Sequence, residues 1–202
     1  MRHCVYIDKT EEVVMNIREY IKRKINDPWI GTDIEGYKFL GNVQKGDIGE
    51  KYVSDHMREK FHCKVLPADC GPNGPYDRIV GGINTEIKFS AAHSDNPIFE
   101  KTGVPTIKRN KRGEVSWTIN HVAVGKCWER LIFCGMDLVD GVAVPNLVWC
   151  TKQDFINCLN ETTLFKPQQG GKNGDNDDFM CAGASVIKWI KSGYTKDINE
   201  WN

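Results

Sequence analysis

Three residues that can support hydrolytic chemistry lie close together in the first half of the chain: Asp77, Glu86 and Lys88. Gly81-Gly82 stands between the two acidic residues, and a glycine pair suits a tight two-residue turn between antiparallel strands. Pairing outward from that turn places Asp77 opposite Glu86, with their Cβ atoms roughly 4.5 to 5.5 Å apart. Because like charges at that spacing repel, we expect a cation between them.

Strand alternation places Lys88 on the same face as Glu86 and sends Ile87 and Phe89 to the opposite face. Hard divalent cations such as Mg²⁺ favour carboxylate oxygens and retain bound waters, and a neighbouring ammonium group can orient such a water. The face therefore has the composition of a hydrolytic metal site. The alternative is an exposed Glu/Lys strand face beside an unrelated turn aspartate.

A helix predicted from Asp47 towards Phe61 precedes this hairpin, with Val53 and Met57 on its apolar face. Glu50 falls on the same face, so it points towards the interior and is a candidate to complete the metal shell. The alternative is that Asp47 and Glu50 form a capping box, in which the glutamate only ties down the start of the helix. Both interpretations stay open at this point.

The remaining pattern predicts a mixed α/β (α+β) fold in which a central mixed sheet is flanked by helices. One domain is expected over 1–202, divided into an N-terminal helix and loop (1–46), a catalytic core (47–150) and C-terminal helices with a possible recognition loop (151–202). The other predicted elements are a helix at 10–26, a loop to 42, strands at 63–68, 77–80, 83–90, 115–124, 130–138 and 142–150, a helix at 151–159 capped by Thr151, a polar loop at 166–178 and a short helix at 185–191.

The composition is that of an ordinary soluble protein, with 202 residues and a formal net charge of zero. No apolar run is long enough to span a membrane, and the amino terminus has no secretory signal pattern, so an intracellular, cytoplasmic location is expected. The eight cysteines are scattered without close pairs. Reduced, mostly buried thiols are therefore favoured over a zinc site or disulfides.

The chain resembles the PD-(D/E)XK nuclease superfamily, and specifically the Type II restriction endonucleases. The matching residues are Pro75-Tyr76-Asp77 and Glu86-Ile87-Lys88, preceded by Gly49-Glu50 in the helix. The runs 117–122 and 128–135 look like later core strands of such enzymes, so the resemblance covers roughly 47–150. Tyr76 departs from the motif, because it separates the proline from the aspartate.

The resemblance implies a restriction-endonuclease-like fold and Mg²⁺-dependent hydrolysis of phosphodiester bonds, with Mn²⁺ as a substitute. Asp77 and Glu86 would hold the metal, with the carbonyl of Ile87 as a further ligand. Lys88 would position or activate the attacking water, and Glu50 would act on a metal directly or through water.

Candidate DNA contacts come from side chains whose chemistry suits phosphates and base edges. Ser90 shares the strand face of Glu86 and Lys88, while the other candidates lie in two loop segments and could equally be ordinary loop residues. These loop candidates are Lys108, Arg109, Lys111, Arg112, Gln168, Gln169 and Lys172. His121, in an apolar strand, is expected to be a hydrogen-bonded structural residue rather than a catalyst.

The function predicted from the sequence is sequence-specific cleavage of double-stranded DNA by a Type II restriction enzyme. A homodimer is expected, because one active centre cuts one strand and symmetric sites favour symmetric proteins. The alternatives are a structure-specific or repair nuclease of the same superfamily, a non-catalytic DNA-binding module, and a zinc-stabilised interaction protein.

Overall fold

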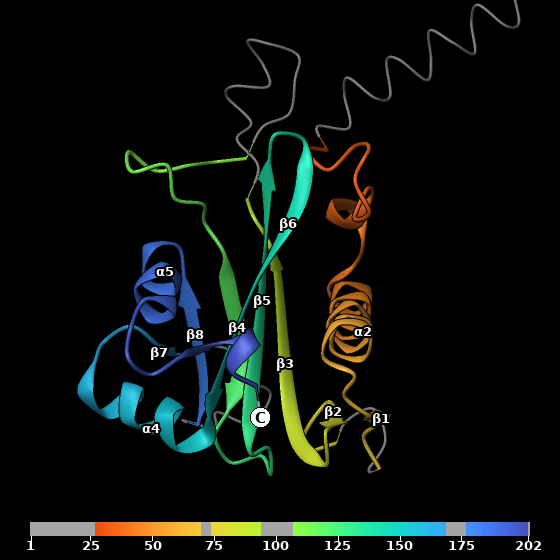
Figure 1. The fold of residues 1–202 in the computed structure, drawn as a ribbon. Helices are drawn as coiled ribbons and strands as arrows, with labels where there is room; N and C mark the ends of the chain where they lie inside the picture. The colour runs from red at the N-terminus through yellow and green to blue at the C-terminus, as the bar shows by residue number, and fades with distance from the viewer. Residues whose placement is uncertain (1–26, 70–73, 94–106, 169–176, 202) are drawn as a thin grey trace, which may run out of the picture.

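The computed structural model describes residues 27–69, 74–93, 107–168 and 177–201. Within them the chain forms a six-stranded sheet, a three-stranded sheet and the helices that pack on them (Figure 1). This confirms the predicted mixed α/β fold, whereas the helix predicted at 10–26 lies outside the described residues. In chain order the elements are η1 (Tyr37–Phe39), α2 (Asn42–Phe61), β1 (Val65–Pro67), β2 (Arg78–Val80), β3 (Ile83–Ala91), β4 (Thr118–Ala123), β5 (Arg130–Val139), β6 (Val142–Thr151), α4 (Lys152–Glu161), β7 (Lys166–Pro167), β8 (Asp178–Ala182), α5 (Ala184–Ile190), β9 (Lys196–Asp197) and η2 (Ile198–Glu200).

The large sheet is mixed, with strand order β1-β2-β3-β5-β6-β9. β3 and β5 pair in parallel, and the other neighbours in this sheet pair antiparallel. β3 is therefore a central strand with partners on both sides. The small sheet has the order β4-β8-β7 and is antiparallel.

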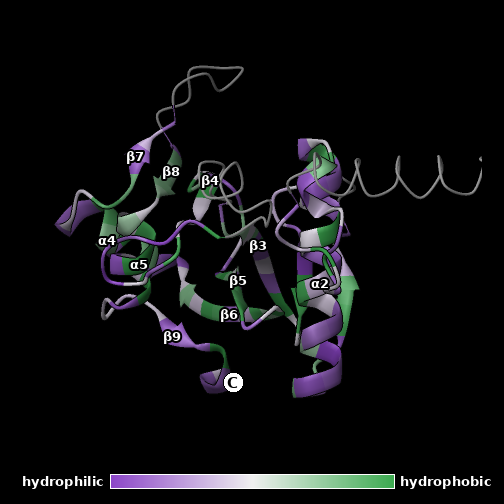
Figure 2. Cartoon of the chain, turned by 90° about the horizontal axis from the view of Figure 1, so that it is seen from above, coloured by the Kyte–Doolittle hydropathy of each residue, from purple (hydrophilic) through white to green (hydrophobic). Residues whose placement is uncertain are grey.

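The two faces of the large sheet pack against different layers (Figures 1 and 2). On one face, Val53 and Met57 of α2 are fully buried against Ile87 and Ile132. On the other face, the small sheet, α4 and α5 cover a second core that contains Leu131 and its neighbours. Because alternate residues of a strand point to opposite faces, β3 sends Ile87 towards α2 and Glu86, Lys88 and Ser90 towards the second layer.

Gly81-Gly82 forms the predicted turn of the β2–β3 hairpin, with φ of 60° and 87°. Two successive residues at positive φ match the type I′ turn, which suits the twist of antiparallel strands. The register pairs Val80 with Ile83 and Arg78 with Thr85, as predicted. The next pair outward is Asp77 and Glu86, which were predicted to lie opposite each other.

The helix α2 begins at Asn42, earlier than predicted, and Gly41 is its N-cap residue. The side chain of Gln44 reaches back to accept a hydrogen bond from the Gly41 backbone N–H at 3.0 Å. Asp47 and Glu50 lie inside the helix, so the prediction that it starts at Asp47 is wrong and the capping-box interpretation of Glu50 is wrong with it. Their spacing imitates a capping box, whereas the actual N-cap, Gly41, lies more than one turn upstream and has no side chain to complete one.

In the C-terminal part of the chain, the predicted helix at 151–159 is present as α4. The loop predicted at 166–178 is wrong in part, because strands of the small sheet lie at both of its ends. Thr151 caps α4 by accepting a hydrogen bond from Asp154 N at 3.1 Å, as predicted. The segment predicted as a polar loop over 166–178 begins with the short strand β7, and β8 starts at its last residue. β7 has only two residues, both exposed, and β8 has a single fully buried residue, so neither strand shows a two-residue hydrophobic alternation.

In the described ranges no helix is both long and apolar enough to cross a membrane. The cysteines in these ranges carry free thiols, and Cys134, Cys150, Cys158 and Cys181 are buried. Burial raises the pKa of Cys181 to about 12, so this thiol stays protonated at neutral pH.

Gly49 sets how closely α2 approaches β3. A Cβ atom built on Gly49 would overlap the Cβ of Phe89 and lie 2.7 Å from its Cγ, and these atoms cannot move aside without moving the strand. Gly46 lies in the same helix and has no heavy atom within 4 Å of the equivalent position. The contact between α2 and the strand that carries Glu86 and Lys88 therefore depends on the missing side chain of Gly49.

We predict that Gly49→Ala lowers the free energy of unfolding by about 1 to 3 kcal/mol, the usual cost of overpacking a core. Gly46→Ala is the matched control and should raise it by up to about 1 kcal/mol, because alanine is the better helix former. Urea unfolding of the two variants and the parent measures both values. Equal changes in the free energy of unfolding of the two variants would show that Gly49 does not determine the distance between α2 and β3.

Candidate active site

Glu86 has no exposed surface, although it carries an ionisable carboxyl group. The Lys88 Nζ atom lies 2.5 Å from Glu86 Oε1 and forms an ion pair with it. The other oxygen, Oε2, is buried and has no hydrogen-bond partner among the residues that the structure describes. A buried acceptor without a partner costs free energy, so this oxygen can interact with a ligand where the described residues offer it no donor.

Asp77 is joined to the same strand by its side chain. Its Oδ2 atom accepts a hydrogen bond from the backbone N–H of Ile87 at 2.7 Å, and its own N–H donates to Thr85 O at 3.1 Å. Ile87 is the residue between Glu86 and Lys88. The hairpin register therefore brings the Asp77 carboxylate to the predicted side chains of β3.

Glu50 comes to this region from α2, and its Oε2 lies 3.0 Å from Arg78 Nη1. Its side chain is 23% exposed, so it is less buried than the prediction of an interior-facing residue implied. Burial and the nearby negative charge of Asp77 raise the pKa of Glu50 to about 7, against the opposing effects of Arg78 and Lys88. Glu50 is thus part of the same electrostatic cluster as Asp77.

Lys88 connects these groups. Burial acts to lower its pKa, but the negative charges of Glu86, Asp77 and Glu50 outweigh burial, and the pKa of Lys88 is raised. Lys88 is therefore an ammonium group at neutral pH. The structure brings all four predicted residues together, arranged as the pairs Lys88–Glu86 and Arg78–Glu50 with Asp77 beside both.

A pocket of about 370 Å³ opens next to Asp77. It gives solvent and ligands access to the acidic side of the cluster, whereas Glu86 lies deeper. The residues that line it are Asp47, Glu50, Pro67, Ala68, Tyr76, Asp77 and Arg78. Tyr76, which separates Pro75 from Asp77, is buried, and its hydroxyl group donates a hydrogen bond to Asp69.

The carboxylates suit a hard divalent cation by their chemistry, because Mg²⁺ prefers oxygen ligands. The unpartnered Oε2 of Glu86 fits the same group. Nevertheless, in the part of the chain that is described, no three His, Cys, Asp or Glu side chains converge closely enough to hold an ion as they stand. Binding an ion here would require the carboxylates to move closer together.

Lys126 is a neighbour of the cluster that the sequence did not reveal. Its Nζ atom lies 3.6 Å from Glu86 Oε1, and the residue belongs to the turn between β4 and β5. No local motif marks it, because the contact joins segments that are distant in the chain. The nearest signal is its place in a glycine-containing turn between two predicted strands.

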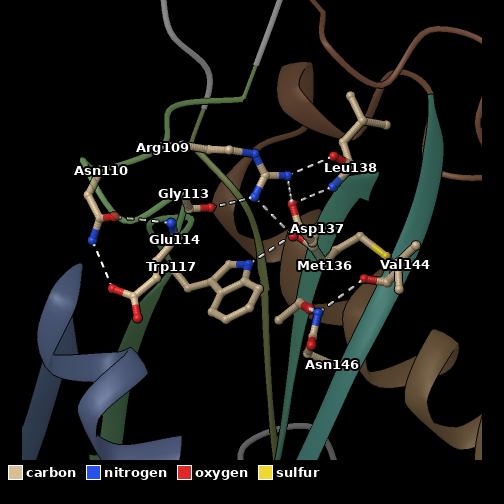
Figure 3. Close-up of polar contacts among 11 residues, drawn as sticks. Arg109, Asn110, Gly113, Glu114, Trp117, Met136, Asp137, Leu138, Val144 and Asn146 are labelled. Carbon is tan, nitrogen blue, oxygen red and sulfur yellow. Dashed lines mark hydrogen bonds and ion pairs between the residues drawn. The ribbon is translucent and has the colours of Figure 1, made fainter. Parts of the chain in front are cut away.

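Ser90 and Arg109, both predicted to contact DNA, make contacts within the protein. Ser90 is buried, and its Oγ atom accepts a hydrogen bond from Thr118 N at 3.0 Å. The guanidinium group of Arg109 binds both carboxylate oxygens of Asp137, at 2.7 and 3.3 Å, and also Leu138 O at 2.9 Å (Figure 3). Arg109 thereby anchors its loop to the end of β5.

The other residues predicted to contact DNA differ in their exposure and in their hydrogen bonds within the protein. Lys108, Lys111 and Arg112 are exposed, while Gln169 and Lys172 lie outside the described residues. The Gln168 Oε1 atom accepts a hydrogen bond from His121 N at 2.8 Å. The His121 ring in turn lies 2.8 Å from Asp178 Oδ2, so His121 is a hydrogen-bonded residue, as predicted.

We predict that Arg109→Ala lowers the free energy of unfolding by about 1 to 2 kcal/mol, since a two-pronged Arg–carboxylate contact is stronger than a typical surface ion pair. Lys111→Ala is the control, because Lys111 makes no hydrogen bond or ion pair with any described residue, and its effect should stay within about 0.5 kcal/mol. Thermal and urea unfolding measure both. An Arg109→Ala variant as stable as the parent would show that the contact between Arg109 and Asp137 contributes nothing to stability.

No family model matches this chain, and neither a curated protein nor a solved structure matches it. The case for a function therefore rests on the residues of the chain itself. It consists of a buried glutamate with one unpartnered oxygen, two further carboxylates and the lysine beside them, brought together by the β2–β3 hairpin and α2.

Proposed function

We propose that this protein is a Mg²⁺-dependent endonuclease that hydrolyses phosphodiester bonds of double-stranded DNA in the manner of a Type II restriction enzyme. The observation that carries the proposal is the state of Glu86, a fully buried carboxylate with Lys88 on one oxygen and no described residue as a partner on the other. A group of this kind is expensive to bury, and it is more common in functional sites than in ordinary cores.

Each residue of the cluster has a role in this proposal. Asp77 and Glu86 would hold the divalent ion, with Glu50 at the pocket acting on it directly or through water, and the carbonyl of Ile87 as a further candidate ligand. A bound ion would supply electrostatic stabilisation of the negative charge that develops on the phosphate and the leaving oxygen. The Lys88 ammonium group donates a hydrogen bond that orients the attacking water towards phosphorus.

The proposed partner is double-stranded DNA, and the proposed assembly is a homodimer. One cluster of this kind cuts one strand, so two copies related by a two-fold axis would cut both strands of a symmetric site. Lys108, Lys111 and Arg112 are exposed and remain candidates for phosphate contacts. Arg109 is a weaker candidate, because its guanidinium group already binds Asp137.

Plasmid cleavage tests the proposal. We predict that the parent cuts supercoiled plasmid DNA in Mg²⁺ or Mn²⁺ and that excess EDTA abolishes cutting. Asp77→Asn should reduce the rate by about 100-fold or more, because an amide is a much poorer ligand for a hard cation. This variant keeps the fold intact, since an asparagine oxygen can still accept the hydrogen bond from Ile87 N.

Asp55→Asn is the matched control. Asp55 lies on the exposed side of α2, where it pairs with Lys51 and Arg58, and its conversion should leave the cleavage rate unchanged. Lys88→Ala should also lose activity, and its thermal unfolding must be compared with that of the parent, because it leaves Glu86 buried without its cation. Full activity of Asp77→Asn would remove Asp77 from the proposed metal site. A parent that binds plasmid DNA in Mg²⁺ without cutting it would contradict the proposed endonuclease function.

A further inference from the structure

Lys126 occupies an unusual position beside the buried carboxylate. Glu86 Oε1 already receives the Lys88 ammonium group at 2.5 Å, and the Lys126 ammonium group stands 3.6 Å from the same oxygen. That second distance is too long for a hydrogen bond. Glu86 therefore does not need Lys126 as a hydrogen-bond donor, and Lys126 keeps its own donors available.

The amine of Lys126 faces solvent as well as the cluster. Its side chain is 37% exposed, against 18% for Lys88. Within the described ranges, the ion pair with Glu86 is the interaction that its Nζ atom makes, and no hydrogen bond accompanies it. A positive group in this situation can contact a ligand in solution while it stays next to the catalytic carboxylate.

The backbone that carries Lys126 is held by contacts from Asp177, the residue before β8, and from α4. Asp177 accepts hydrogen bonds from Gly125 N through its side chain and from Val124 N through its carbonyl group, both at 2.9 Å. The Lys152 ammonium group donates to the carbonyl oxygen of Lys126 at 2.5 Å. These contacts position the lysine in advance, so that little backbone order has to be gained when a ligand binds.

We propose that Lys126 is a phosphate-binding residue of the active centre, whose ammonium group contacts a non-bridging oxygen of the DNA backbone next to Glu86. This inference rests on the proposed endonuclease function. A phosphodiester is the fitting ligand because lysine is a compact point charge that binds phosphate oxygens well. The opposing explanation is that Lys126 only balances the negative charge of Glu86, which would make its role one of stability.

DNA binding and cleavage distinguish the two explanations. Binding of a fluorescently labelled duplex of random sequence is measured by anisotropy in EDTA at several salt concentrations, and cleavage is measured on plasmid DNA in Mg²⁺. Losing one phosphate contact should reduce the slope of log affinity against log salt by about 0.9 and weaken binding by about 3- to 10-fold at moderate salt. We expect this for Lys126→Ala, together with about a 10-fold slower cleavage.

Lys126→Arg should retain most of the slope and of the rate, because the positive charge remains. The control is Lys51→Ala, since Lys51 is a lysine on α2 that pairs with Asp55 and is 73% exposed; it should match the parent in both assays. Thermal unfolding of all the variants reports whether any loss comes from stability.

Each result decides the question. An unchanged salt slope for Lys126→Ala in a parent that cuts DNA would overturn this inference and leave the endonuclease proposal standing. A slower rate with an unchanged slope would do the same and would assign Lys126 to the support of Glu86. A parent that neither binds nor cuts DNA would overturn both proposals.

Discussion

Burying the carboxylate of Glu86 costs free energy, and neighbouring groups must offset this cost by favourable interactions. The positions of the other residues of the site follow from this requirement. A charged group moved out of water is stabilised only by a well-placed counter-charge and by hydrogen bonds. Lys88 supplies the counter-charge at 2.5 Å. No described residue supplies a partner for Oε2, so the described part of the chain stabilises this carboxylate only incompletely. This imbalance is the physical basis for assigning a ligand to the site.

The strand order of the large sheet explains how the buried Lys88–Glu86 pair can lie so close to the pocket next to Asp77. β3 is a central strand, so its residues can be fully enclosed, while β2 is short and lies near the sheet edge, so Asp77 at its start remains reachable from the pocket. The helix α2 adds Glu50 because Gly49 lets it approach Phe89. Each layer thus contributes one part: the hairpin gives the acidic pair, α2 gives Glu50, and the second layer gives Lys126.

The sequence predicted those parts of the site that depend on short-range rules. The Gly81-Gly82 turn determines the hairpin register, so the relation between Asp77 and Glu86 followed from counting residues. Thr151 showed where α4 begins for a similar local reason. The start of α2 was misplaced because Asp47 and Glu50 have the spacing of a capping box, whereas the true cap, a glycine with Gln44, is a weaker sequence signal.

Contacts between distant segments could not be predicted in this way. Lys126 reaches Glu86 only because β4 and its following turn pack on the second face of the sheet, and nothing near it in the chain records that packing. For the same reason, the prediction that Arg109 contacts DNA rested only on the basic residues next to it in the sequence. Its partner Asp137 lies at the far end of another strand, so its structural role became visible only in the fold.

The central claim is that Glu86 and Asp77 together hold a divalent cation. The most direct measurement is anomalous X-ray scattering from crystals of the protein soaked in Mn²⁺, which locates the ion without reference to any activity. The account predicts an anomalous peak within coordination distance of Glu86 Oε2 and the Asp77 carboxylate, and its loss in crystals of Asp77→Asn. Saturating Mn²⁺ that leaves these two carboxylates without a peak, with the Lys88–Glu86 pair unchanged, would contradict it.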